Sequence, residues 1–261
     1  MKYLQSSERR DSREITNLIT INTSYSKEKA TEILKQGGYD TLFMDFTRNQ
    51  EAFIRAIAKG VEPELAMEHM KDLGLVKEPE DTQDFRAAEP LFECLPSLEL
   101  EDTNIYCYKE EASRILSRDI AVKVLILTAK AKLGKIEVEE WKEVMRDDIY
   151  NEFESAEGEA KYIADRAEKK NICLDASEEL LSSLSGLGFR VKEIVVDKPC
   201  KPLDILGEKI KCEILGGDVV TEDEVIGLVR DHVRFVEMII EKGYERAYWM
   251  WSMHHSKRGT T

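Results

Sequence analysis

The chain has 261 residues, of which 42% are apolar and 34% are charged, and its formal net charge is −14. This length suits one large α/β domain, or a domain that carries an appendage. Phosphate binding needs concentrated Lys and Arg, so the acidic balance excludes nucleic acid and anionic membrane surfaces as expected partners. No uncharged run is as long as a membrane span requires, so we predict no membrane segment.

The cysteines indicate a reducing compartment. They are odd in number, widely spaced and set in mostly apolar contexts: Cys94, Cys107, Cys173, Cys200 and Cys212. We interpret them as reduced thiols. Residues 1–14 are polar and no apolar signal region follows them, so we predict a cytoplasmic protein. No paired CxxC motif is present, which argues against a structural zinc site.

The first part of the chain alternates strand and helix signals. The apolar stretch 15–22 predicts a strand, and residues 26–36 predict a helix closed by Gly37 and Gly38. A second strand is expected over 39–46, followed by a Thr47–Gln50 capping box that opens a helix ending at Gly60. Another helix is expected between Pro63 and Gly74. Two strand–helix units in succession predict parallel strands.

The middle of the chain is dominated by helix signals. The acidic segment 77–102 contains three prolines and predicts one short helix around 84–95. Residues 104–108 predict a third strand. From 110 to 170 the apolar positions recur at broadly helical spacing, which predicts a long helical region.

The stretch 171–197 predicts a strand, a helix and a second strand, which is a βαβ unit of a mostly parallel sheet. A helix over 203–215 follows, and a Thr221–Glu224 capping box opens a long amphipathic helix. The predicted fold class is therefore α/β. We expect a mostly parallel sheet of about five strands covered by helices in residues 1–198, with a helical C-terminal appendage in residues 199–261.

Polar side chains follow the predicted strands. If these strands are parallel neighbours, the groups after them meet at one edge of the sheet, where chemistry gathers in such folds. Convergent carboxylates with Lys and Arg could perform acid–base work or hold a small anion. The candidate pocket consists of Tyr25, Asp45, Arg48, Tyr108, Lys109, Arg118, Asp119, Asp175 and Ser177.

The same residues also have purely structural interpretations. Ser24 and Ser177 are typical helix caps, and Asp45 and Asp175 can accept hydrogen bonds from local backbone N–H groups. The Arg118–Asp119 pair, which lies beside apolar positions of a predicted helix, is also typical of a solvated salt bridge.

The histidines do not predict a metal site. None of His69, His232, His254 and His255 has a histidine partner three or four residues away, as a helical metal site requires. We interpret them as structural or surface residues and expect no metal and no cofactor. GxSxG, Walker and GxGxxG motifs are also missing from the sequence.

The aromatic stretch 244–251, YERAYWMW, leaves two alternatives open. Its rings can pack onto the main domain, as bulky aromatic side chains commonly do. If they stay exposed, they mark a contact with a second copy or with a protein partner. The sequence therefore predicts a homo-oligomer or a protein complex formed through the C-terminal helices as one possibility.

Three stretches resemble the TraB/TIKI family, in the wider group with erythromycin-esterase-like and ChaN-like proteins. LITINTSYSKEKATEILKQGGYDTLFMDF (18–46) resembles the family's first strand, helix and second strand, which ends in an acidic residue, here Asp45. SRDIAVKV (117–124) resembles the helix with an Arg-Asp pair. NICLDASEELLSSLSGLGFRV (171–191) resembles a late strand whose loop carries a GxGH-type motif.

The resemblance implies a metal-dependent hydrolase or peptidase scaffold, yet two of its residues differ. Tyr25 stands where the family's first histidine would be, and Ser177 stands where the second would be. Metal-dependent hydrolysis is therefore not expected. We predict a non-enzymatic, regulatory or interaction protein on a TraB-like scaffold. The alternative is a small-molecule-binding protein or metal-independent enzyme that uses the candidate pocket.

Overall fold

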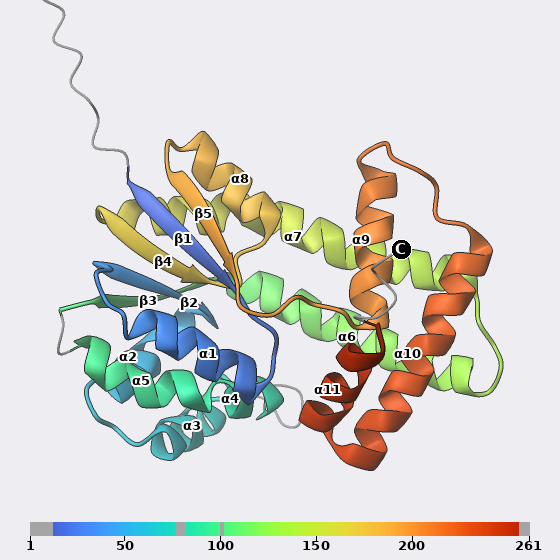
Figure 1. The fold of residues 1–261 in the computed structure, drawn as a ribbon, viewed down its shortest axis with the longest axis horizontal. Helices are drawn as coiled ribbons and strands as arrows, with labels where there is room; N and C mark the ends of the chain where they lie inside the picture. Colours follow the sequence, from blue (N-terminus) through green and yellow to red (C-terminus); the bar gives the residue numbers. More distant parts are fainter. Residues whose placement is uncertain (1–12, 77–81, 100–101, 256–261) are drawn as a thin grey trace, which may run out of the picture.

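A computed structural model describes residues 13–76, 82–99 and 102–255 (Figure 1). Predictions that concern residues 1–12, and those for 77–81 and 100–101 of the acidic segment, lie outside the described residues. Five strands form one parallel sheet in the order β3-β2-β4-β1-β5. The strands are β1 (Glu14–Ile19), β2 (Thr41–Thr47), β3 (Asn104–Lys109), β4 (Lys170–Leu174) and β5 (Arg190–Val195). The predicted α/β fold class is confirmed.

Alternation along each strand divides the core into two layers. In β2, Leu42 and Met44 belong to one hydrophobic cluster, whereas Phe43 between them belongs to the other. This follows from the period of two in a strand, which sends successive side chains to opposite faces of the sheet. Helices on both faces therefore bury the sheet on both sides, as parallel sheets require.

The helices that follow β1 and β2 cover one face of the sheet (Figure 1). They are α1 (Ser24–Leu34), α2 (Glu51–Ala58), α3 (Pro63–Asp72), α4 (Thr82–Ala87) and α5 (Glu89–Glu99). The opposite face is covered by part of α7 (Val138–Arg166) and by α8 (Glu178–Gly186). Strands β1 to β3 are added towards one edge of the sheet, and β4 and β5 are added back towards the other edge. This change of direction between β3 and β4 produces the doubly wound arrangement.

Three predicted elements need correction. The first strand ends at Ile19 rather than residue 22, because the N–H of Thr20 donates to the Asp175 side chain instead of continuing the ladder. The single short helix expected around 84–95 is two helices, α4 and α5. The N-cap of α1 is Thr23 rather than Ser24, and its side chain accepts from the N–H of Ser26. The Thr47–Gln50 and Thr221–Glu224 capping boxes are both present.

The long helices α6 (Glu111–Lys132) and α7 extend beyond the sheet and meet α9 (Pro202–Ile214) and α10 (Glu222–Lys242) (Figure 1). Trp141 and Leu127 share one hydrophobic cluster with Ile210 and Val229. Helices α9 and α10 thus build their core together with α6 and α7, whereas the last helix of the chain packs in a separate cluster around Phe235. The domain boundary that we place after residue 198 stays a prediction.

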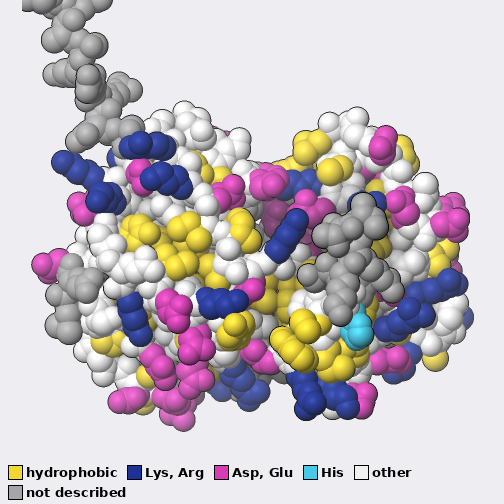
Figure 2. All heavy atoms as spheres, viewed as in Figure 1, with side chains coloured by type: hydrophobic (Ala, Val, Ile, Leu, Met, Phe, Trp, Pro, Cys, Tyr) yellow, Lys and Arg dark blue, Asp and Glu magenta, His cyan; other side chains and the backbone are white. Residues whose placement is uncertain are grey.

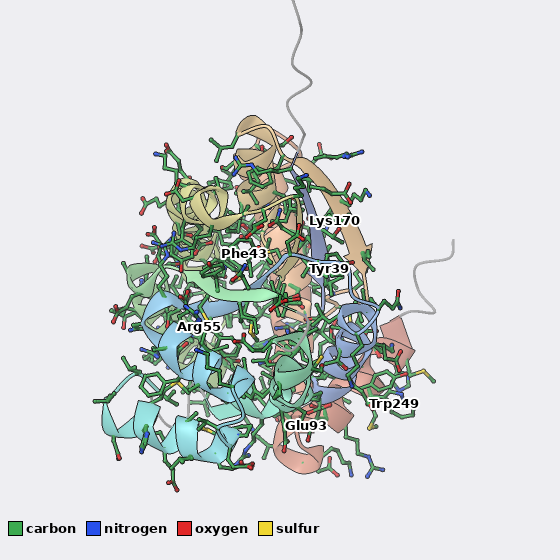
Figure 3. The ribbon with its side chains drawn as sticks, turned by 90° about the vertical axis from the view of Figure 1, so that its left-hand side faces the viewer. Tyr39, Phe43, Arg55, Glu93, Lys170 and Trp249 are labelled. Carbon is green, nitrogen blue, oxygen red and sulfur yellow. The ribbon has the colours of Figure 1, made fainter. Side chains whose placement is uncertain are left out.

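The last helix, α11 (Tyr244–His255), packs two of its aromatic rings inward. Tyr248 and Trp251 contact Phe235 of α10, and the indole Nε1 of Trp251 donates to the carbonyl of Cys200 at 3.1 Å. Trp249 lies on the outside of this helix and is 61% exposed (Figure 3). Tyr244 packs against Tyr248, so packing accounts for three of the four aromatic rings in this stretch.

The surface carries acidic side chains over both the sheet-based part and the helical part, as expected from the net charge (Figure 2). The five cysteines are free thiols, and Cys94, Cys107 and Cys173 are buried. Among the described helices, none combines the length and the apolar character that crossing a membrane requires.

Candidate functional site

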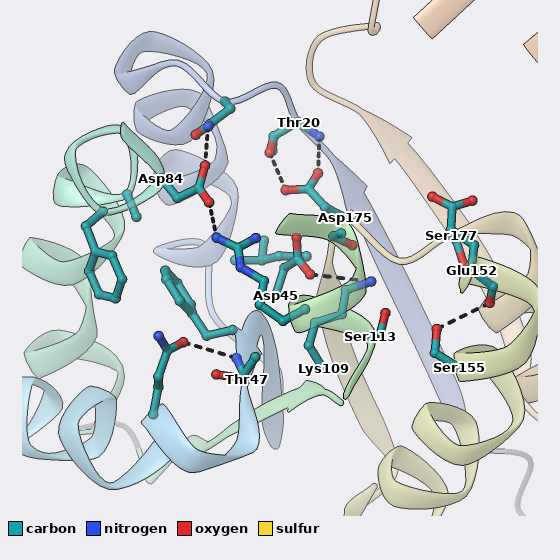
Figure 4. Close-up of a pocket in the computed structure, with 18 of the residues that line it drawn as sticks. Thr20, Asp45, Thr47, Asp84, Lys109, Ser113, Glu152, Ser155, Asp175 and Ser177 are labelled. Atoms are coloured by element: carbon teal, nitrogen blue, oxygen red, sulfur yellow. Dashed lines mark hydrogen bonds and ion pairs between the residues drawn. The ribbon is translucent and has the colours of Figure 1, made fainter. Parts of the chain in front are cut away.

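A cavity of about 360 Å³ opens at the carboxyl edge of the sheet (Figure 4). Residues at or just after the ends of β1, β2, β3 and β4 line it, so it occupies the edge where parallel sheets bind ligands. Helices α4 and α5 border it on one side, and α6 and α7 border it on the other. In Figure 4, Asp84 lies on the first side, Glu152 and Ser155 lie on the second, and Asp45 and Lys109 lie between them.

Asp175, after β4, organises one wall of the cavity. Its carboxylate accepts hydrogen bonds from the N–H of Thr20 at 2.6 Å and from the Thr20 hydroxyl at 2.7 Å. The ammonium group of Lys27 donates to the same carboxylate at 2.6 Å and to the Thr20 hydroxyl at 2.6 Å. These contacts connect the ends of β1 and β4 to helix α1.

The backbone of this loop is held in an uncommon conformation. Asp175 has a φ of 54°, the left-handed region that aspartate tolerates better than most residues. The buried side chain of Asn17 supports the loop by accepting from the N–H of Ala176 and donating to its carbonyl. An aspartate therefore suits the position on both backbone and side-chain grounds.

A second charged group joins the ends of β2 and β3. The Lys109 ammonium lies 3.6 Å from Asp45 Oδ1 and 3.6 Å from Oε2 of Glu159, which is buried. Burial opposes the charge of Lys109, but the carboxylates of Asp45 and Glu159 together raise its pKa above the ordinary value. Lys109 is therefore a fixed cation between two carboxylates.

Tyr108 supports Asp45 from below the cavity floor. Its buried hydroxyl donates to the carbonyl of Leu174 at 2.9 Å and lies 3.4 Å from Asp45 Oδ1. Burial, followed by the nearby Asp45 carboxylate, raises the pKa of Tyr108 well above its ordinary value. Enclosure by the cavity walls also raises the pKa of Asp45, and Lys109 opposes that shift.

A third ion pair borders the cavity at α4. Arg114 of α6 pairs with Asp84, whose other carboxylate oxygen accepts from the side-chain amide of Asn22 at 2.6 Å. The loop after β1, helix α4 and helix α6 are thereby connected. Each of the three cations that line the cavity, Lys27, Lys109 and Arg114, is thus next to a carboxylate.

Two further carboxylates differ from these because they lack such partners. Asp148 and Glu152 lie one turn apart on α7 and both line the cavity. Among the described residues, neither side chain forms a hydrogen bond or an ion pair. Desolvation by the surrounding side chains, and secondly the charge of Asp148, raise the pKa of Glu152 to about 7. Glu152 is nevertheless exposed to the open cavity, and the charges of Lys109 and Lys211 oppose the shift. Burial raises the pKa of Asp148, and the charge of Lys201 opposes that shift.

The rest of the lining is part polar and part apolar. Helices α6 and α7 contribute hydroxyl and amide groups, and the side-chain amide of Asn151 donates to the Ser117 hydroxyl at 3.0 Å. On the opposite side, Phe46 and Phe85 line the cavity with ring centroids 5.3 Å apart. Leu91 extends this apolar wall.

The structure brings four of the predicted pocket residues to this cavity: Asp45, Lys109, Asp175 and Ser177. Tyr108 lies directly behind Asp45. Ser177 also acts as the N-cap of α8, because its hydroxyl accepts from the N–H of Leu180. Its structural interpretation is therefore correct, although it still borders the cavity.

The other predicted pocket residues do not line the cavity. Arg48 donates to the carbonyls of Tyr108 and Gly158, and its guanidinium lies over the Tyr162 ring. Tyr25 is 61% exposed, and the ammonium group of Lys29 lies over its ring. Arg118 is half-buried and Asp119 is exposed, and neither is among the residues that line the cavity.

Several lining residues were not among the sequence candidates, chiefly Lys27, Asp84, Arg114, Asp148 and Glu152. They lie inside helices, whereas the sequence argument searched the strand ends. One available signal was the spacing of Asp148, Glu152 and Ser155, which recur at helical spacing along one face of α7. That signal alone does not say what the face contacts.

The described residues contain no group of three or more His, Cys, Asp or Glu side chains arranged to hold a metal ion. His232 is a structural residue, with Nε2 lying 3.0 Å from the Thr128 hydroxyl and its ring against Trp141. Burial lowers the pKa of His232 to about 4.

No family model, curated protein or solved structure matches this chain. The TraB/TIKI resemblance stays a prediction. The functional argument therefore rests on the geometry and charge of the cavity.

Proposed function

We propose that this protein binds a small organic amine in the cavity at the carboxyl edge of the sheet. The observation that supports this most directly is the pairing of charges in the cavity lining. Lys27, Lys109 and Arg114 each form an ion pair with a carboxylate, whereas Asp148 and Glu152 form none with any residue that the structure describes. The charges of the lining that are left without an ion-pair partner in the described part of the chain are therefore negative.

The balance of charge favours a cation over an anion. Among the described residues, the lining contains five carboxylates and three cations, so an anionic ligand would add to an existing excess of negative charge. A protonated amine placed next to Glu152 and Asp148 would supply the direct ion-pair partner that neither carboxylate has among the described residues. The amine would thereby add to the more distant charges of Lys109, Lys211 and Lys201. Its binding would also lower the raised pKa of Glu152.

The shape of the lining indicates what else the ligand carries. Phe46, Phe85 and Leu91 form an apolar part of the lining, and Phe85 and Leu91 belong to α4 and α5 rather than to α7, which carries the two carboxylates. Ligand sites combine such apolar walls with a few polar groups that orient the molecule. A compact amine with an apolar or aromatic body, and with room for hydroxyl groups near Ser113 and Ser117, suits this arrangement.

Three compounds of similar shape and different charge test the proposal: phenethylamine, 2-phenylethanol and phenylacetate. We expect phenethylamine to raise the melting temperature of the protein in a concentration-dependent way, 2-phenylethanol to do so weakly and phenylacetate not at all. Equal effects of all three compounds, or a stronger effect of phenylacetate, would contradict the proposal.

Variants then locate the binding. In the double variant Asp148→Asn/Glu152→Gln, titration calorimetry should show phenethylamine affinity reduced at least about tenfold, since charge-assisted hydrogen bonds to the amine are lost. Glu154→Gln changes an exposed carboxylate on the same helix and serves as the matched control. Unchanged affinity in the double variant would place the amine elsewhere.

A second candidate function is that of an interaction protein acting through its C-terminal helices. The observation that favours it is Trp249, a large aromatic side chain left exposed while its neighbours Tyr248 and Trp251 pack inward. Exposed aromatic residues are enriched at binding surfaces. Light scattering on the wild type and on Trp249→Ala tests whether self-association uses this residue; equal masses at every concentration would count against that use.

A further inference from the structure

Helix α6 is apolar on two separate faces. Ile120, Leu127 and Ala131 lie in the core that α6 shares with α7, α9 and α10. On the outward face, Ile115, Val122, Ile126 and Leu133 are between 49% and 81% exposed. A surface helix of a globular protein typically has one apolar face, so the second face calls for a partner.

The four exposed residues form a straight line along the helix. Their separations are 7, 4 and 7 residues, and at 100° per residue all four fall within a sector of about 40°, with Leu133 standing at the C-cap of α6. We name Ile115, Val122, Ile126 and Leu133 the outer stripe of α6. Leu125 and Ala129 are exposed beside it and widen it. Asp119 is the polar residue nearest its centre line.

We propose that the outer stripe is a homodimer interface in which two copies of α6 pack antiparallel across a two-fold axis. The separations 7, 4 and 7 read the same in both directions along the chain. An antiparallel second copy therefore places its Leu133 against Ile115 and its Ile126 against Val122. This self-complementarity is what an isologous interface requires, because each contact occurs twice.

The charges next to the outer stripe fit the same arrangement. Lys123, Lys130 and Lys132 already pair with acidic residues of α7 and α10, so no unpaired lysine faces its counterpart in the second copy. In the antiparallel register, Asp119 lies opposite Ala129 and next to Lys130 of the second copy. Asp119 of one copy therefore does not meet Asp119 of the other.

The apolar area that α6 exposes is also large enough for a dimer interface. From the exposed fractions of its large apolar side chains, α6 presents on the order of 600 Å² of apolar surface, at the upper end for a patch on a monomer. A polar rim would bring this near the ~800 Å² per partner of a standard interface. The seam would be about 30 Å long at 1.5 Å per residue. This inference does not rest on the proposed amine site.

Sedimentation velocity and light scattering test the oligomeric state. The chain has a mass of 30.0 kDa, and we expect the wild type to show twice that mass at micromolar concentration. Val122→Asp/Ile126→Asp should be monomeric with an unchanged circular dichroism spectrum. Leu73→Asp, at a site 66% exposed outside α6, should remain dimeric. A monomeric wild type, or a dimeric double variant, would overturn the proposal.

Cross-linking tests the orientation of the two helices. In a Cys212→Ser background, Asp119→Cys protein carrying an affinity tag is mixed with untagged Ala129→Cys protein and treated with a short bis-maleimide. Antiparallel packing predicts a product that joins one tagged and one untagged chain, because positions 119 and 129 face each other. Products joining only like chains would indicate parallel packing and refute the proposed geometry, as would the absence of any cross-link.

Discussion

The Lys27 ammonium lies 2.6 Å from the Asp175 carboxylate, although 147 residues separate the two in the chain. Both side chains are largely buried, with 12% and 19% of their surface exposed. Thr20, which donates two hydrogen bonds to the same carboxylate, completes the group. One carboxylate therefore holds together the ends of β1 and β4 and the first turn of α1, and so determines the shape of one cavity wall.

Asp175→Ala should be strongly destabilising. It removes three hydrogen bonds and leaves Lys27 enclosed without a counter-charge, so we expect a loss of about 3 kcal/mol in the free energy of unfolding. Asp102 is a matched control, because it also has a positive φ, 59°, and is exposed. Asp102→Ala should cost about 1 kcal/mol through backbone strain alone. Urea unfolding measures both, and equal losses would show that the Asp175 contacts contribute nothing.

The ion pair of Lys109 with buried Glu159 should contribute more to the stability of the fold than its ion pair with Asp45. Lys109→Met leaves Glu159, which is 1% exposed, as an uncompensated buried charge, and should cost about 3 kcal/mol. Asp45→Asn leaves the Lys109–Glu159 pair intact and should cost about 1 kcal/mol or less. Adding Glu159→Gln to Lys109→Met should recover part of the loss, because the buried charge is then removed. Failure of that double variant to recover would contradict this explanation.

Glu152 should make stability depend on pH in an unusual direction. Its folded pKa of about 7 lies above its ordinary value, so the folded state binds more protons than the unfolded state between pH 4.5 and 7. The contribution of Glu152 to stability therefore falls as pH rises through this range, by about 1 kcal/mol after allowance for solvent in the open cavity.

Glu152→Gln should remove this dependence. Urea unfolding at pH 5 and pH 8 should show the variant gaining about 1 kcal/mol relative to wild type at the higher pH. Glu154→Gln, on the same helix, should show no such gain. If the difference between Glu152→Gln and wild type is the same at both pH values, then Glu152 does not titrate in this range.

His232 should give stability the opposite pH dependence to that of Glu152. Burial lowers its folded pKa to about 4, so the unfolded state binds more protons between pH 6.5 and pH 4. Its contribution to stability is complete above pH 6.5 and is lost as pH falls towards 4, by about 2–3 kcal/mol. His232→Phe keeps a ring beside Trp141 and cannot take up a proton. Unfolding of wild type and variant across this range should show the stability difference narrowing or reversing at low pH; a constant difference would contradict the prediction.

The strands and the parallel arrangement were predictable because they depend on local patterns. Short apolar runs such as 39–46, flanked by helix signals and capping boxes, specify strand–helix units without reference to the rest of the chain. The same reasoning placed Asp45, Lys109 and Asp175 at or just after the ends of strands and hence at one edge of the sheet. Where it was wrong, as at the end of β1, a distant side chain had replaced a local partner, since Asp175 accepts the hydrogen bond of Thr20.

The helical half of the cavity was not predictable in this way. Asp148 and Glu152 read as ordinary polar positions of a charged helix, and their sequence neighbours say nothing about what lies across from them. Their place in the cavity comes from the tertiary packing of α7, and Lys109 pairs with Asp45 rather than with either of them.

The amino-acid sequence by itself determined the α/β class, the order of strands and helices, and the strand-end position of three charged cavity residues, because hydrophobic periodicity and capping act over a few residues. Tertiary packing decided which charges of the cavity lining have an ion-pair partner and which have none among the described residues. It also decided which face of α6 is buried and which is exposed, because a helix with two apolar faces does not reveal from its sequence which of them the fold will cover.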